Sequence, residues 1–166
     1  DINLLIVLFP KMRSVREKYT EYHTYPLSII RVNDTLITVC KETPSFLTHI
    51  MNNESFKNEP ATTQHHIILY ILWELTRSFI RHLREIDGII EDLQIQITSA
   101  THNEYFYKLI ALHKSLVYFE TSINKNHPLI TESIHESVLG DDVQSQELLR
   151  DITDISNQAE VMVTES

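Results

Sequence analysis

The chain of 166 residues has only two glycines, five prolines and one cysteine. So few glycines and prolines leave little material for the many tight turns of an all-β fold, and long helices are favoured instead. The single cysteine, Cys40, excludes an internal disulfide framework and suits a reducing compartment. A chain of this length forms one domain or two small ones, and its hydrophobic content of 42% is sufficient for a core.

Long hydrophobic runs are also missing. The longest apolar run extends only from Ile67 to Trp73, well short of the roughly 20 residues that cross a bilayer. The opening residues, DINLLIVLFP, contain Asp1 and no basic stretch, so a signal peptide is not expected. We therefore expect a soluble piece. Its abrupt start in an apolar run suggests that it was cut from a longer protein.

Negative charge is concentrated in the last part of the chain. The net charge is −9, and residues Leu129 to Ser166 carry nine carboxylates against one base, Arg150. Nucleic acid is therefore a poor partner, because phosphate binding requires a basic face. A cation or a basic surface fits this region better. A solvated acidic helix with no binding role remains the simple alternative.

The chain divides near Pro60 into a β-rich part, residues 1–59, and a long-helix part, residues 60–166. In the first part, Asn3 to Phe9 has the length and composition of a strand, and Lys11 to Lys18 is expected to be a basic loop. Tyr19 to Tyr25 alternates aromatic and polar residues.

The hairpin signal is the clearest feature of this β-rich part. The β-branched runs Leu27 to Val32 and Thr35 to Val39 flank Asn33-Asp34, which predicts two strands joined by a tight turn. Pro44 is expected to open a short helix over Ser45 to Met51. The polar stretch Asn52 to Pro60 is expected to be a loop.

After Pro60 the apolar residues recur at helical spacing. One continuous stripe covers about eight turns of a first long helix. Its members are Ile68, Leu72, Leu75, Phe79, Leu83, Ile86, Ile90, Leu93 and Ile97.

A capping box, Thr101-x-x-Glu104, is expected to start a second helix. Asn124 to His127 is expected to end this helix, and Pro128 to start a shorter one that ends near Gly140. The apolar stripe of the second helix is Phe106, Leu109, Leu112, Leu116, Phe119 and Ile123.

Asp141 or Asp142 is expected to cap the last helix, which reaches the end of the sequence without a stop signal. Its apolar face is Leu148, Ile152, Ile155, Ala159 and Met162. The predicted fold class is thus α+β: a small, hairpin-containing β-sheet domain followed by the long antiparallel helices of a stalk-type bundle.

Four segments occur in an order and spacing that resembles the cytoplasmic region of CorA-type magnesium transporters. They are YPLSIIRVNDTLITVCKE, FIRHLREIDGIIEDLQ, KLIALHKSLVYFETSINKN and ELLRDITDISNQAE, and KSLVYFETS is the most specific part. The resemblance implies a cytoplasmic α/β domain and a stalk helix that continues into the membrane of a pentamer. This sequence contains neither the transmembrane helices nor the Gly-Met-Asn motif of such transporters. By resemblance it is the sensor and stalk portion, and it cannot conduct ions alone.

The candidate metal ligands are Glu147, Asp151 and Asp154, which fall at i, i+4 and i+7 on one face of the last helix. Such a stack of like charges is mildly unfavourable, and a hard cation such as Mg²⁺ would reverse this. The resemblance implies a regulatory Mg²⁺ between adjacent subunits, with a ligand at Asp151 in the motif Leu149-Arg150-Asp151. Its partner carboxylate would come from a segment upstream of Asp1.

The chain departs from the family at two further positions of that regulatory site. They carry Leu72 and Ile155, which are apolar and cannot bind metal. A regulatory site formed by this chain would therefore lack an oxygen ligand at both positions.

Enzymatic chemistry has little support. None of the nine histidines lies in an HExxH-like pattern, and no nucleophile elbow or phosphate-binding glycine loop is present. The sequence therefore predicts a non-catalytic, cytoplasmic regulatory domain of a divalent-cation transporter, for Mg²⁺ and possibly Co²⁺, gated by metal between subunits. Two alternatives stay open: a zinc-transporting member of the same superfamily, and a helical adaptor with no metal role.

Overall fold

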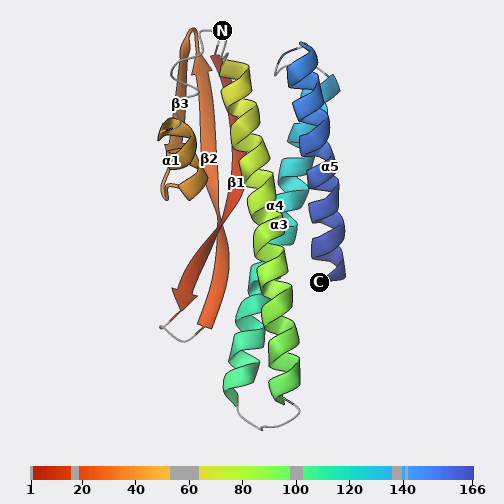
Figure 1. Ribbon diagram of the computed structural model, residues 1–166. Helices are drawn as coiled ribbons and strands as arrows, with labels where there is room; N and C mark the ends of the chain where they lie inside the picture. Colours follow the sequence, from red (N-terminus) through yellow and green to blue (C-terminus); the bar gives the residue numbers. More distant parts are fainter. Residues whose placement is uncertain (1, 16–18, 53–63, 98–102, 136–139, 141) are drawn as a thin grey trace.

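The computed structural model describes residues 2–15, 19–52, 64–97, 103–135, 140 and 142–166. A three-stranded sheet lies beside a long helical layer, in the α+β arrangement that the sequence predicts (Figure 1). The elements in chain order are β1 (Ile2–Val15), β2 (Tyr19–Val32), β3 (Thr35–Cys40), α1 (Ser45–Asn52), α3 (Gln64–Ile97), α4 (Asn103–His135) and α5 (Val143–Glu165).

The sheet has the order β1-β2-β3, and both pairs are antiparallel. The predicted hairpin between β2 and β3 is confirmed, and its turn residue Asn33 takes a positive φ of 51°, which asparagine tolerates better than most residues. The short helix predicted after Pro44 is confirmed as α1. The loop predicted over Asn52 to Pro60 lies almost wholly outside the described residues.

The prediction of a basic loop from Lys11 to Lys18 is wrong for its first half. Strand β1 continues to Val15, and Lys11 pairs with His23 of β2. Basic residues are tolerated here because this end of the β1–β2 ribbon extends past the end of β3 (Figure 1). Lys11 therefore keeps its ammonium group at the surface, where it contacts Glu42 at 2.7 Å.

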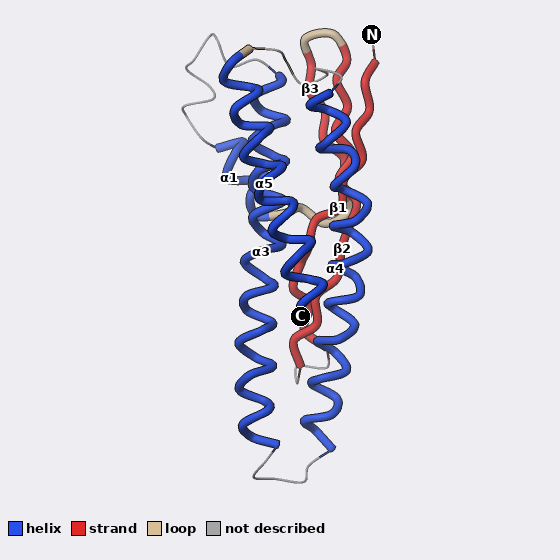
Figure 2. Tube along the Cα trace, turned by 90° about the vertical axis from the view of Figure 1, so that its right-hand side faces the viewer, coloured by secondary structure: helices blue, strands red, loops and turns tan. Residues whose placement is uncertain are grey.

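Helices α3 and α4 form a long antiparallel pair that extends beyond the C-terminal end of α5 (Figure 2). The prediction that a helix ends at Asn124 to His127 and restarts at Pro128 is wrong, since α4 passes through Pro128 without a break. Ile130, two residues later, is buried and lies on the same apolar face as Ile123, seven residues before it. Packing of this face outweighs the hydrogen bond that Pro128 cannot donate.

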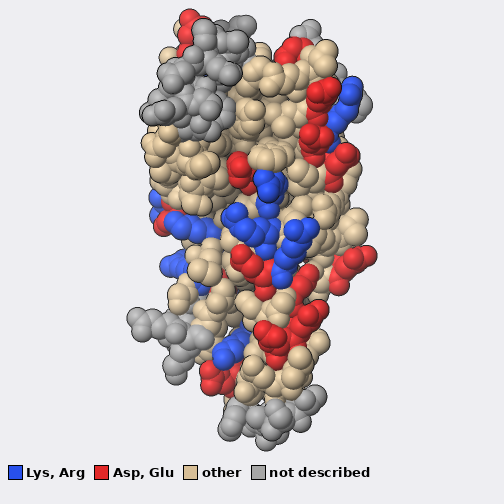
Figure 3. All heavy atoms as spheres, viewed as in Figure 1, with Lys and Arg blue, Asp and Glu red and all other residues tan. Residues whose placement is uncertain are grey.

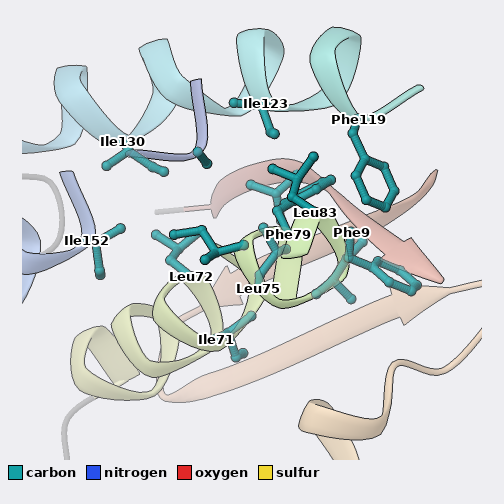
Figure 4. Close-up of a cluster of buried hydrophobic side chains, with 14 of the residues drawn as sticks. Phe9, Ile71, Leu72, Leu75, Phe79, Leu83, Phe119, Ile123, Ile130 and Ile152 are labelled. Carbon is teal, nitrogen blue, oxygen red and sulfur yellow. The ribbon is translucent and has the colours of Figure 1, made fainter. Parts of the chain in front are cut away.

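The hydrophobic core lies where α3, α4, α5 and the sheet meet (Figure 4). Phe79 of α3 packs edge-on against Phe119 of α4, with ring centroids 5.3 Å apart, and both rings are buried. Most of the predicted α3 stripe is buried, whereas Phe106 of the predicted α4 stripe is 61% exposed. Phe106 lies in the first turns of α4, which run beside the far end of α3 and beyond the reach of α5 (Figure 2).

Three buried polar side chains attach α4 to the sheet. Asn126 receives a hydrogen bond from the Leu8 amide at 2.9 Å and donates one to the Leu8 carbonyl at 2.7 Å. The Tyr22 amide donates to Ser115 Oγ at 2.8 Å, and Ser122 Oγ donates to a threonine hydroxyl of β2 at 2.8 Å. The Asn126 and Ser115 contacts satisfy backbone groups of β1 and β2, and the Ser122 contact joins two side chains.

None of the described helices combines the length and the apolar character required to cross a bilayer.

Candidate metal site on the acidic helix

The N-terminus of α5 is fixed by Asp142, one of the two predicted caps. Its carboxylate accepts hydrogen bonds from the Ser145 amide at 3.0 Å and from Ser145 Oγ at 2.6 Å. These bonds, with His66 nearby, lower the pKa of Asp142 from 3.8 to about 2. Gly140 adopts φ 99° just before the cap, where a side chain would be strained and would contact Asp142. Asp141 lies outside the described residues.

One face of α5 packs on the α3–α4 pair and the other faces outward. The buried residues are Ser145, Leu149, Ile152, Ser156, Ala159 and Val163. Glu147, Asp151 and Asp154 are all exposed on the outward side. The structure therefore places the three candidate ligands on the solvent side of one helix, where oxygen atoms can bind a hard cation that keeps several waters.

The described residues do not assemble a closed metal site. No three histidine, cysteine or carboxylate side chains among them converge to hold an ion. Ligands on α5 would therefore need partners from outside the described part of this chain. The assignment of Glu147, Asp151 and Asp154 as ligands remains a prediction.

The two apolar residues at expected ligand positions have different surroundings. Leu72 is 2% exposed and belongs to the core (Figure 4). Ile155 is half-buried and lines a groove between α3 and α5. An oxygen ligand at position 72 would place a charge inside the core, so burial explains why leucine occupies that position.

A polar contact links α5 to α4. His127 Nδ1 lies 2.8 Å from Ser156 Oγ, and His127 Nε2 lies 3.7 Å from Glu160 Oε2. Because Ser156 is buried, this contact ties the packed face of α5 to the middle of α4. A displacement of α5 would therefore be transmitted to α4.

The structure also shows a charged groove that sequence reasoning missed. It has a volume of about 620 Å³ and lies between α3 and α5. Helix α5 contributes Ile155 and Gln158 to its lining, and α3 contributes charges of both signs: Arg77, Arg81, Arg84, Glu74 and Glu85. The i, i+4, i+7 spacing of the arginines was a signal for one basic face, but only the fold shows that this face borders α5.

A polar cluster around Glu85, one of the residues that line this groove, ties β2 to α3. Tyr22 Oη donates to Glu85 Oε2 at 2.8 Å, and His82 Nδ1 lies 2.8 Å from the same oxygen. Burial, followed by the Glu85 contact, raises the pKa of Tyr22 well above its ordinary range. Partial burial acts to raise the pKa of Glu85, but the hydrogen bonds from His82 and Tyr22 outweigh it, so this pKa is lowered.

Comparison with known proteins agrees with this architecture. The sequence model of the family described as "CorA-like Mg2+ transporter protein" matches residues 1–166. The cobalt/magnesium transport protein CorA of Methanocaldococcus jannaschii is 31% identical over 64 residues, which are 39% of this chain and 20% of that protein.

Solved structures give the same fold over almost the whole chain. The soluble domain of CorA from M. jannaschii superposes with a TM-score of 0.85 at 21% identity, covering 99% of this chain and 65% of that one. The complete M. jannaschii CorA magnesium transporter gives a TM-score of 0.82 at 22% identity, covering 99% and 51%. The ZntB cytoplasmic domain of Vibrio parahaemolyticus gives 0.64 at 16% identity, covering 99% and 66%. The chain thus spans less than two thirds of the length of the M. jannaschii proteins that it matches.

Proposed function

Because this chain belongs to the CorA family of Mg²⁺ transporters, we propose that it is the regulatory, metal-sensing part of such a transporter. In this role it lies on the cytoplasmic side of the membrane and assembles with further copies of itself, as a pentamer. It performs no catalysis. In this role, the position of α5 changes with the concentration of a divalent cation.

The observation that supports this proposal is the placement of Glu147, Asp151 and Asp154. They form an acidic face on a helix that is otherwise well packed, and all three are exposed. Since the described residues supply no closed ligand set, ligands from an adjacent copy would complete the coordination. Bound metal then neutralises carboxylates that repel each other when it leaves.

The coupling of this site to the rest of the chain follows from the packing of α5. Metal binding favours the arrangement of copies in which the carboxylates converge, and it shifts the population toward that state. His127 and Ser156 connect α5 with α4, so the change at the acidic face reaches the helical layer beside the sheet.

The cargo is proposed as Mg²⁺, with Co²⁺ as a second candidate, from the names of the family and of the M. jannaschii relative. The likeness to the ZntB domain concerns the fold and leaves zinc as an alternative. Exposed carboxylates without cysteine or histidine suit Mg²⁺ better than Zn²⁺, which favours nitrogen and sulfur ligands.

The test uses Mn²⁺ as a paramagnetic substitute for Mg²⁺ in NMR spectra of this chain. We expect Mn²⁺ to broaden the amide signals around Glu147, Asp151 and Asp154 first, and millimolar Mg²⁺ to reverse this broadening. A variant with Glu147→Gln, Asp151→Asn and Asp154→Asn should lose the effect. The matched control is Glu120→Gln, which neutralises an exposed carboxylate on α4.

Two results would refute the metal role. One is broadening that is spread over the surface or centred elsewhere. The other is broadening near α5 that survives the triple substitution. Competition by Zn²⁺ at much lower concentration than Mg²⁺ would instead support the zinc alternative.

A further inference from the structure

A second cavity lies away from the acidic face of α5, where β1, the start of α1 and one face of α3 meet. Its volume is about 410 Å³, and pockets that hold small molecules in proteins measure about 300–1,000 Å³. The cavity, here called the α1 pocket, is thus large enough for a small ligand. The chemistry of its lining indicates which kind of ligand would fit.

The polar groups of the α1 pocket are all bases or hydroxyls. The bases are Lys11 of β1 and Arg81 and His82 of α3, and no carboxylate is found among the described residues that line the pocket. Arg81 is exposed and belongs to none of the ion pairs in the described part of the chain. The lining therefore differs from that of the groove between α3 and α5, which carries both signs of charge.

A carboxylate next to the pocket, Glu42, does not cancel its positive charge. Glu42 contacts Lys11 at 2.7 Å, but the two side chains are 42% and 41% exposed, and such a surface pair is weak enough to exchange its partner. The hydrogen bond and charge of Lys11, and beyond them the charges of Lys41 and Arg13, lower the pKa of Glu42. Glu42 thus has three basic neighbours and can neutralise only one of them. Basic side chains gather across the middle of the face shown in Figure 3, over α3 and below α1.

The other part of the lining is apolar and partly open. Phe46 of α1 is half-buried, and Met12 of β1 is 59% exposed. The buried ring of Phe9 packs edge-on against Phe46, with ring centroids 6.2 Å apart, and so fixes its orientation. A fixed aromatic ring and a flexible thioether together suit the carbon body of a ligand.

We propose that the α1 pocket binds a small organic phosphate. Arg81 binds two phosphate oxygens through its planar fork, and Lys11 supplies a second positive charge. The exposed hydroxyls of Thr43 and Ser45 also line the pocket and can donate to the remaining oxygen. A phosphate suits this set better than a carboxylate, because it carries up to two charges and three acceptor oxygens. The carbon body packs on Phe46 and Met12. This inference is independent of the metal role proposed for α5.

The experiment titrates phenyl phosphate into this chain and follows the amide signals by NMR in a phosphate-free buffer of constant ionic strength. We expect saturable shifts at Lys11, Thr43, Phe46 and His82. Three partial probes separate the contributions: inorganic phosphate lacks the ring, phenol lacks the phosphate, and benzoate replaces it by a carboxylate. Each should bind at least about tenfold more weakly, since each loses apolar contact or charged hydrogen bonds.

Substitutions locate the site. Arg81→Gln and Lys11→Gln should each raise the dissociation constant of phenyl phosphate at least about tenfold, because each removes a charged hydrogen bond. The matched control is Arg84→Gln, which changes an exposed arginine of α3 that lines the groove beside α5 but not the α1 pocket. Arg84→Gln should leave the affinity unchanged. The amide spectrum of each variant reports at the same time whether it is folded.

Four results would overturn the proposal. The first is the absence of saturable shifts, and the second is shifts centred on the groove between α3 and α5. The third is an equal loss of affinity in Arg81→Gln and Arg84→Gln. The fourth is a partial probe that binds as tightly as phenyl phosphate, since the pocket would then not recognise an organic phosphate. None of these results affects the Mn²⁺ experiment at α5, so the two proposals fail separately.

Discussion

Replacing Asn126 by alanine should destabilise the protein far more than its small volume suggests. The Asn126 side chain is buried and makes two hydrogen bonds with the backbone of Leu8, at 2.9 Å to the amide and 2.7 Å to the carbonyl. Its side chain thus forms with Leu8 the two hydrogen bonds that a neighbouring strand would form. Alanine removes both bonds at once and offers no substitute.

The expected loss of stability follows from the Leu8 amide and carbonyl, which the substitution leaves without their partner. Each lost hydrogen bond costs about 0.5–1.5 kcal/mol net, and an unpaired buried group costs about 1–3 kcal/mol. Because Leu8 is only half-buried, water can reach part of its backbone and reduce this penalty. We therefore expect Asn126→Ala to lower the free energy of unfolding by about 2–3 kcal/mol. Asn126→Asp should cost at least as much, since it places a carboxylate against the Leu8 carbonyl.

Urea unfolding followed by circular dichroism measures this change, with Asn124→Ala as the control at an exposed position of the same helix. Hydrogen exchange of the Leu8 amide gives a local readout and should accelerate in Asn126→Ala but not in Asn124→Ala. If the free energies of unfolding of the two variants differ by less than about 0.5 kcal/mol, the Asn126 contacts do not stabilise β1.

Two further predictions concern α4 and α5. Pro128→Ala should raise the free energy of unfolding by about 2 kcal/mol. Proline in a helix interior is about 3 kcal/mol less favourable than alanine, and its stiffening of the unfolded chain offsets up to about 1 kcal/mol of this. A lower free energy of unfolding in urea for the variant would show that α4 needs the proline. For Asp142, the lowered pKa means that its carboxylate stabilises the fold fully above pH 3.8, and this contribution is lost as the pH falls toward about 2. Asp142→Asn keeps a capping side chain that does not titrate in this range. The wild type should therefore have a higher free energy of unfolding than the variant above pH 3.8, and this difference should disappear as the pH falls toward about 2. A difference that does not change with pH would contradict the role of the carboxylate.

The sequence was most informative where one element alone carries the signal. The apolar stripe of α3 appears directly in the spacing of Ile68, Leu72 and Leu75, and all three are buried. The hairpin around Asn33 and the cap at Asp142 are likewise local patterns of a few residues. Each depends on backbone geometry within one segment, so sequence spacing suffices to predict it.

The sequence was misleading where contacts between distant elements outweigh a local preference. Pro128 favours a helix boundary, yet α4 continues because Ile123, Asn126 and Ile130 are all fixed by packing or hydrogen bonds to other elements. The basic residues after Phe9 resemble a loop, yet β1 continues because β2 supplies backbone partners up to Val15.

The candidate site divides in the same way. Spacing alone placed Glu147, Asp151 and Asp154 on one face of a helix, and the structure shows that this face is the exposed one. The sequence could not predict that Leu72 is enclosed by the core, or that Arg77, Arg81 and Arg84 border α5 across a groove.

By itself, then, the sequence determined the apolar stripe of α3, the hairpin, the acidic character of α5 and the membership of the CorA family, because each is carried by residues close together along the chain or by their order. The predicted face of α5 was only partly right, since Ile152 and Ala159 are buried but Leu148, Ile155 and Met162 are only partly so. Only the tertiary structure decided that α4 is unbroken, that Asn126 forms hydrogen bonds with β1, and that a groove lined by charged residues of α3 lies beside the acidic helix. The physical reason is distance along the chain. Leu8 and Asn126 are 118 residues apart, and no local periodicity relates groups that meet only when the chain folds.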